Sequence, residues 1–96
     1  MAEQIEGTVV SISKSGSLVT DISAGQLALA PRDERVTVSC GGHDTACILS
    51  ADHDEPESTL LAMIGPSDKL EIAIVGMNIS EMLGLKVGEK VVVKWE

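Results

Sequence analysis

The stretch Arg35-Val36-Thr37-Val38-Ser39-Cys40-Gly41-Gly42 contains the clearest structural signal in this 96-residue sequence. Its apolar and polar side chains alternate with a period of two, which is typical of a strand with one buried face. Gly41 and Gly42 follow directly, and adjacent glycines supply the positive φ angles that a tight hairpin turn needs. We therefore expect residues 43–50 to form the return strand of a β-hairpin.

Similar segments lie on both sides of this hairpin. Apolar or β-branched runs bounded by turn residues recur at 7–13, 18–22, 60–64, 70–75 and 90–95. Gln26 to Ala30 contains good helix formers and is followed by Pro31, so one helical turn is expected there. About six or seven short strands with turns every eight to twelve residues predict an all-β barrel or sandwich, forming a single domain over residues 1–96. A closed six- to seven-stranded β-barrel is favoured, because closure would hide the strand edges of a sequence so rich in Val and Ile.

One short helix is expected at about residues 79–83. Asn78 and Glu81 have the spacing of a capping box, in which a polar cap residue is followed three positions later by Glu. Gly84 is the expected C-terminal stop, because glycine readily adopts the left-handed conformation that ends a helix.

The composition excludes several classes of function. The sequence has no Phe, no Tyr and one Trp, Trp95, so it lacks the aromatic platforms on which single-stranded nucleic acids stack. Its formal charge of −8 repels phosphates and anionic lipid headgroups. We therefore expect neither a nucleic-acid partner nor a membrane-surface role for this acidic protein.

The sequence also indicates a cytoplasmic location. Residues 1–6 contain two acids and no basic residue, unlike the start of a signal peptide. The longest uninterrupted apolar run covers only 60–64, too short to span a bilayer. Two cysteines in such a chain favour a reducing compartment over a disulfide scaffold.

A possible metal site is the cluster of Cys40, His43, Cys47 and His53, spaced C-x2-H-x3-C-x5-H. Thiolates and imidazoles are the usual ligands of zinc, but this spacing is not one of the standard structural pairs. The simpler interpretation places Cys40 and Cys47 on strands as small apolar residues, His43 at a hairpin tip and His53 in a polar loop. These four residues are therefore weak candidates, and no bound metal is expected.

No motif for catalysis or cofactor binding is present. The sequence contains neither a phosphate-binding glycine loop nor a G-x-S-x-G nucleophile elbow. We predict no catalytic residue and no cofactor from the residues themselves.

The order of these segments resembles one known domain. Gly7-Thr8-Val9-Val10-Ser11-Ile12, followed by Gly16 and Leu18-Val19-Thr20, is similar to the opening of the C-terminal β-barrel domain of the S-adenosylmethionine hydroxide adenosyltransferases, relatives of the fluorinase and chlorinase. The stretch from Leu70 to Gly84 resembles the closing strand and short helix of that domain without a gap, and Val87-Gly88-Glu89 leads into its final strand.

The resemblance implies a division of labour between two domains. In that family an N-terminal α/β domain supplies the catalytic Asp, and the C-terminal barrel contacts the adenine, typically at a subunit interface. The 96 residues here are too few to include the α/β domain. The resemblance therefore implies a barrel that is not catalytic by itself, with self-association expected.

The positions that would contact a ligand depart from the family pattern. The opening hairpin usually reads Asp-x-Phe-Gly-Asn-Leu-x-Thr-Asn, whereas residues 13–21 match it only at Gly16, Leu18 and Thr20. A second turn usually reads Asn-Ser-x-Gly, where Gly65-Pro66-Ser67-Asp68 stands here. By position, the weak candidates for ligand contact are Ser15, Gly16, Ser17, Gly65, Ser67 and Val75. We expect the scaffold to be kept and the nucleoside-recognising side chains to be absent.

Three functional interpretations follow. The first is a stand-alone, non-catalytic barrel that binds a small, nucleoside-like molecule or a protein partner. The second is a separated subunit of a split S-adenosylmethionine hydrolase-like enzyme, completed by an α/β catalytic chain. The third is a structural or metal-binding barrel whose resemblance is topological only. Analysis for bound metal and co-purification with an α/β chain distinguish them.

Overall fold

The computed structural model describes residues 3–14, 16–50, 55–65 and 68–95. Its strands are β1 (Glu3–Ile12), β2 (Leu18–Ser23), β3 (Val36–Cys40), β4 (His43–Ala46), β5 (Leu49–Ser50), β6 (Leu60–Ile64), β7 (Lys69–Ile74) and β8 (Lys90–Trp95). Its helical elements are the 3-10 helix η1 (Gly25–Leu27) and the α-helix α1 (Ile79–Leu83).

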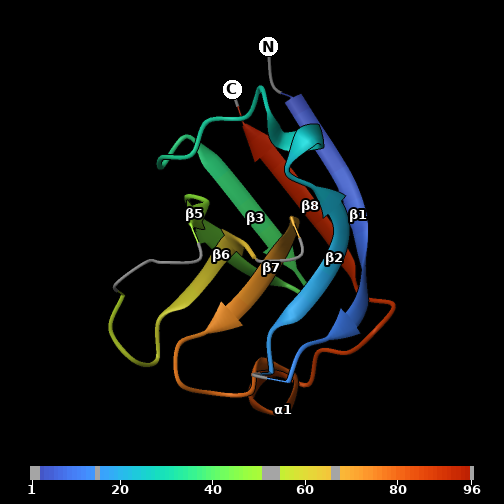
Figure 1. The fold of residues 1–96 in the computed structure, drawn as a ribbon, viewed down its shortest axis with the longest axis vertical. Coiled ribbons are helices and arrows are strands. Elements are labelled where there is room, and N and C mark those ends of the chain that lie inside the picture. The colour runs from blue at the N-terminus through green and yellow to red at the C-terminus, as the bar shows by residue number, and fades with distance from the viewer. Residues whose placement is uncertain (1–2, 15, 51–54, 66–67, 96) are drawn as a thin grey trace.

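The strands form one barrel-like sheet in the order β4-β3-β8-β1-β2-β7-β6-β5 (Figure 1). The long strand β1 joins its two halves, because residues 3–8 pair with β8 and residues 9–12 pair with β2 across an irregularity in register. The ends of the sheet approach each other where the Thr45 hydroxyl in β4 donates to the Leu60 carbonyl in β6, at 3.2 Å. Of the two all-β folds expected, a barrel or a sandwich, the six- to seven-stranded barrel is confirmed, with the two-residue β5 as a further short strand.

The barrel interior is filled by aliphatic side chains, as the aromatic-poor composition requires. The largest fully buried ones are Leu18, Ile22, Leu27, Leu70, Ile79, Val9, Val36, Val38, Val91 and Val93. Thr20 is also fully buried, and its hydroxyl donates to the Leu70 carbonyl at 2.7 Å and accepts from the Ile22 amide at 3.2 Å. This interior residue is therefore satisfied in both of its hydrogen-bonding roles.

The predicted hairpin at Gly41-Gly42 is confirmed, but its return strand is shorter than expected. Cys40 pairs with His43, and both glycines have positive φ. Strand β4 ends at Ala46 because Cys47 adopts a φ of 73°, which turns the chain out of the extended conformation. The chain then re-enters the sheet as β5, which runs parallel to β6. The prediction of one strand over 43–50, with Cys47 inside it, was wrong.

The two predicted helical segments are present. The turn expected over 26–30 is the 3-10 helix η1, which buries Leu27. In α1 the Asn78 side chain accepts a hydrogen bond from the Glu81 amide, and Gly84 ends the helix with a φ of 69°. The helix lies at the end of the barrel opposite the two termini (Figure 1). No helix among the described residues is long and apolar enough to cross a membrane.

Candidate functional site

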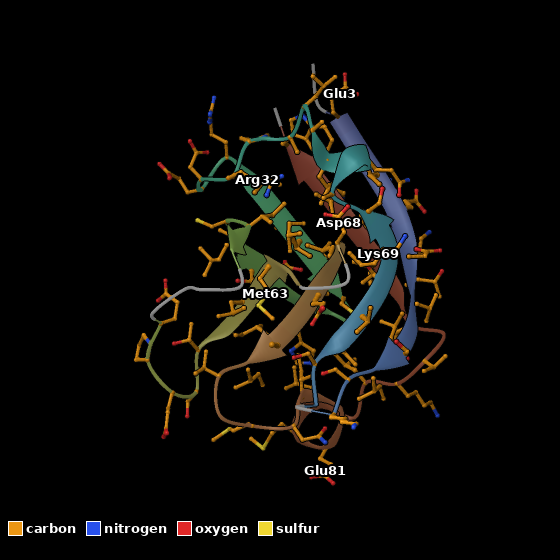
Figure 2. The ribbon with its side chains drawn as sticks, in the orientation of Figure 1. Glu3, Arg32, Met63, Asp68, Lys69 and Glu81 are labelled. Atoms are coloured by element: carbon orange, nitrogen blue, oxygen red, sulfur yellow. The ribbon has the colours of Figure 1, made fainter. Side chains whose placement is uncertain are left out.

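An open pocket of about 370 Å³ lies beside the end of β7, where the chain turns into α1. Its lining comes from the β1–β2 turn, from strands β6 and β7, and from the connection that follows β7. The lining residues are Ser17, Met63, Ala73, Ile74, Val75, Gly76, Met77 and Asn78. Figure 2 shows Met63 on β6 and Glu81 at the outer side of α1, where it points away from the barrel.

One wall of the pocket is the β1–β2 turn, which packs against the start of α1. The Ile79 amide donates to the Gly16 carbonyl at 3.1 Å. Gly16 is buried with a φ of 89°, and a Cβ placed on it would lie 2.6 Å from the Cα of Asn78. Only glycine therefore fits this contact, for both conformational and steric reasons. The neighbouring Ser17 is 5% exposed, so it presents little polar surface of its own.

A second wall is the connection from β7 to α1, which continues the pairing of β6 with β7. The Val75 amide donates to the Thr59 carbonyl at 3.0 Å, and the Ser58 amide donates to the Val75 carbonyl at 2.9 Å. The Met77 amide then donates to the Ile74 carbonyl at 3.0 Å, which closes a tight turn. This wall is thus fixed by backbone hydrogen bonds at both of its ends.

The chemistry of the lining suits binding more than catalysis. None of the described lining residues has a titratable side chain, so the lining supplies neither a general acid nor a general base. The Asn78 side-chain oxygen caps α1, which leaves the N–H groups of its amide as the part that can meet a ligand. The other side chains are mostly aliphatic or thioether groups.

Two of the ligand candidates predicted by position line this pocket, and a third builds its wall. Ser17 and Val75 line it, and Gly16 lets the β1–β2 turn pack closely against Asn78. Gly65 lies elsewhere, buried in the β6–β7 turn against the carboxylate of Glu71. Ser15 and Ser67 fall outside the described residues. Prediction from the sequence missed the lining role of Met63, Gly76, Met77 and Asn78. For Gly76, Met77 and Asn78, the one sequence signal was the match of residues 70–84 to the family motif.

The metal candidates are not brought together in the described part of the chain. Cys40 is buried at the end of β3, whereas His43 is exposed and Cys47 is half-buried after β4. His53 lies outside the described residues. No three side chains of His, Cys, Asp or Glu within 3–14, 16–50, 55–65 and 68–95 are grouped so that they could hold a metal ion.

Cys40 has the properties of a core residue. Burial, and to a smaller extent the Glu89 carboxylate, raises the pKa of its thiol. It lines a cavity of only about 10 Å³ at the seam between β4 and β6, room for no more than about one water molecule. A neutral, enclosed thiol is a poor nucleophile.

Comparison with known proteins places this geometry in context. The family model described as SAM hydroxide adenosyltransferase C-terminal domain matches residues 7–92. No curated protein matches the chain. A solved structure of an uncharacterised conserved protein of Thermotoga maritima superposes with a TM-score of 0.74 and 23% identity, covering 94% of this chain and 35% of that one.

A second solved structure has the same relation to the chain. A conserved hypothetical protein of Thermus thermophilus superposes with a TM-score of 0.65 and 24% identity, over 92% of this chain and 32% of that one. These likenesses show the fold. The chain spans about a third of the length of both proteins.

Proposed function

Because the chain belongs to the SAM hydroxide adenosyltransferase C-terminal domain family, we propose that it is a non-catalytic binding module that holds a small molecule in the pocket between the β1–β2 turn and the β7–α1 connection. The observation that carries this proposal is the lining itself. It includes Ser17 from the β1–β2 turn, where the family resemblance implies ligand contact, and its described residues include no titratable side chain.

The expected ligand differs from the adenine nucleosides that the family resemblance implies. Where the family motif has an Asn that both donates and accepts, Ser17 stands in this chain and is nearly buried. Val75, on the other wall, adds an apolar side chain and no side-chain hydrogen bond. The pocket therefore offers shape and apolar contact, with Asn78 as its main polar side chain.

A thermal-shift screen of small molecules tests this role. A ligand that binds only the folded state stabilises it, by about 2.7 kcal/mol at a ligand concentration a hundredfold above Kd, and therefore raises the thermal midpoint. Ala73→Leu places a larger side chain in the pocket and should abolish that shift. Thr37→Leu, at a half-buried strand position outside the pocket lining, is the matched control and should retain it. The proposal fails if no compound stabilises the protein, or if hits stabilise Ala73→Leu equally.

A second candidate function is a subunit of an enzyme completed by an α/β chain. It is favoured by the coverage of the solved relatives, since about two thirds of each has no counterpart in these 96 residues. Affinity purification of the tagged protein from its own cells tests it. Stoichiometric recovery of an α/β chain of adenosyltransferase type would support the two-chain enzyme, and recovery of the barrel alone would count against it.

A further inference from the structure

We propose that the pocket selects a small aliphatic monocation, such as a primary alkylammonium ion, over neutral and anionic molecules of the same shape. This inference rests on the proposed binding role of the pocket and specifies the chemical class of the ligand. It is carried by a carboxylate that lies beside the pocket-lining residue Gly76 and is not itself part of the lining.

That carboxylate belongs to Glu57, which lies against the pocket-lining residue Gly76. A Cβ placed on Gly76 would be 3.5 Å from the Glu57 Cγ and 3.8 Å from its Oε1. Glu57 is exposed, so its carboxylate is in contact with solvent beside this part of the lining.

The backbone holds Glu57 in this place. The adjacent Ser58 amide donates to the Val75 carbonyl at 2.9 Å, and the Val75 amide donates to the Thr59 carbonyl at 3.0 Å. Residues 58–59 therefore extend the β6–β7 pairing up to Val75, which places the backbone of Glu57 next to this part of the pocket lining.

The lining complements a cation with an apolar tail. Met63, Ala73 and Met77 supply aliphatic and thioether surface, and Met adapts readily to ligands of different shape. None of the described lining residues is a Lys or Arg that would neutralise Glu57. The formal charge of −8 adds a long-range field of the same sign, which attracts cations and repels anions.

Three five-carbon probes separate charge from shape: n-pentylammonium, pentan-1-ol and pentanoate. Binding is followed at millimolar concentration by the amide NMR shifts of Gly76, Met77 and Asn78. We expect n-pentylammonium to bind about fivefold more tightly than pentan-1-ol, because an ion pair at a solvent-exposed carboxylate provides an advantage of about this size. Pentanoate should bind most weakly.

Two variants that each remove one negative charge complete the test. Glu57→Gln should abolish the preference for the ammonium ion, whereas Glu34→Gln, on an exposed loop outside the pocket lining, should leave it unchanged. Equal binding of all three probes, or an unchanged preference in Glu57→Gln, overturns this inference while the binding role stands. Absence of any shift with all three probes also overturns this inference, while the binding role itself is decided by the thermal-shift screen with Ala73→Leu.

Discussion

Substitution of Gly16 by Ala tests how the pocket wall is built. Gly16 has a φ of 89°, a conformation that costs an L residue roughly 1–2 kcal/mol. The new Cβ would also lie 2.6 Å from the Cα of Asn78, a backbone atom that cannot swing away. The β1–β2 turn and α1 must then separate, and overpacking of this kind costs a further 1–3 kcal/mol or so.

Gly84→Ala is the matched control for this prediction. Gly84 also has a positive φ, 69°, but a Cβ placed there meets nothing within 4 Å. It should therefore lose only the conformational part, roughly 1–2 kcal/mol. For a domain of this size, the difference between the two variants corresponds to a thermal midpoint lower by about 5–20 °C in Gly16→Ala.

Urea unfolding followed by Trp95 fluorescence measures both variants. The free energy of unfolding should fall by about 2–5 kcal/mol in Gly16→Ala. The hydrogen bond from the Ile79 amide to the Gly16 carbonyl should also weaken, which faster amide exchange at Ile79 would show. If the two variants lose the same stability, to within about 0.5 kcal/mol, the β1–β2 turn does not pack on Asn78 as described.

Three further predictions concern the core, the helix cap and metal binding. Thr20→Val should lower the free energy of unfolding by about 1–3 kcal/mol in urea, because it leaves the Leu70 carbonyl and the Ile22 amide without the buried hydroxyl; an unchanged midpoint would contradict this. Asn78→Ala should cost about 1 kcal/mol through loss of the cap, and Asn78→Ser should restore most of it. Protein purified without chelators should contain no stoichiometric zinc by elemental analysis, and one zinc per chain that disappears in Cys40→Ser would refute that expectation.

Local sequence patterns predicted the elements whose signals are short in range. The Gly41-Gly42 hairpin and the Asn78 cap depend on residues within a few positions of each other, and both are confirmed. The break at Cys47 could not be predicted in this way. It is followed by a hydrogen bond from the Ile48 amide to the Arg32 carbonyl, two residues that become neighbours only when the sheet has formed.

Part of the pocket lining was named from the sequence, by resemblance to the family pattern. The family pattern pointed to Ser17 and Val75, and both line the pocket. Asn78 was interpreted only as a helix cap, because its second role depends on the β1–β2 turn lying beside α1. Glu57 belongs to a polar loop by composition, and only the pairing of residues 58–59 with Val75 brings it beside the pocket-lining residue Gly76. Cytoplasmic location and self-association stay predictions.

The central claim is that this chain keeps the scaffold of its family without the side chains that recognise a nucleoside. Calorimetric titration with adenosine and with S-adenosylmethionine tests it most directly. Each unmade hydrogen bond to a buried group costs roughly 1–3 kcal/mol, so the loss of two or three weakens a micromolar site by about a hundredfold or more. We predict no dissociation constant below about 10 µM for either compound, a value that corresponds to roughly 7 kcal/mol. A dissociation constant at or below that value would show that the nucleoside pocket survives and would contradict the claim.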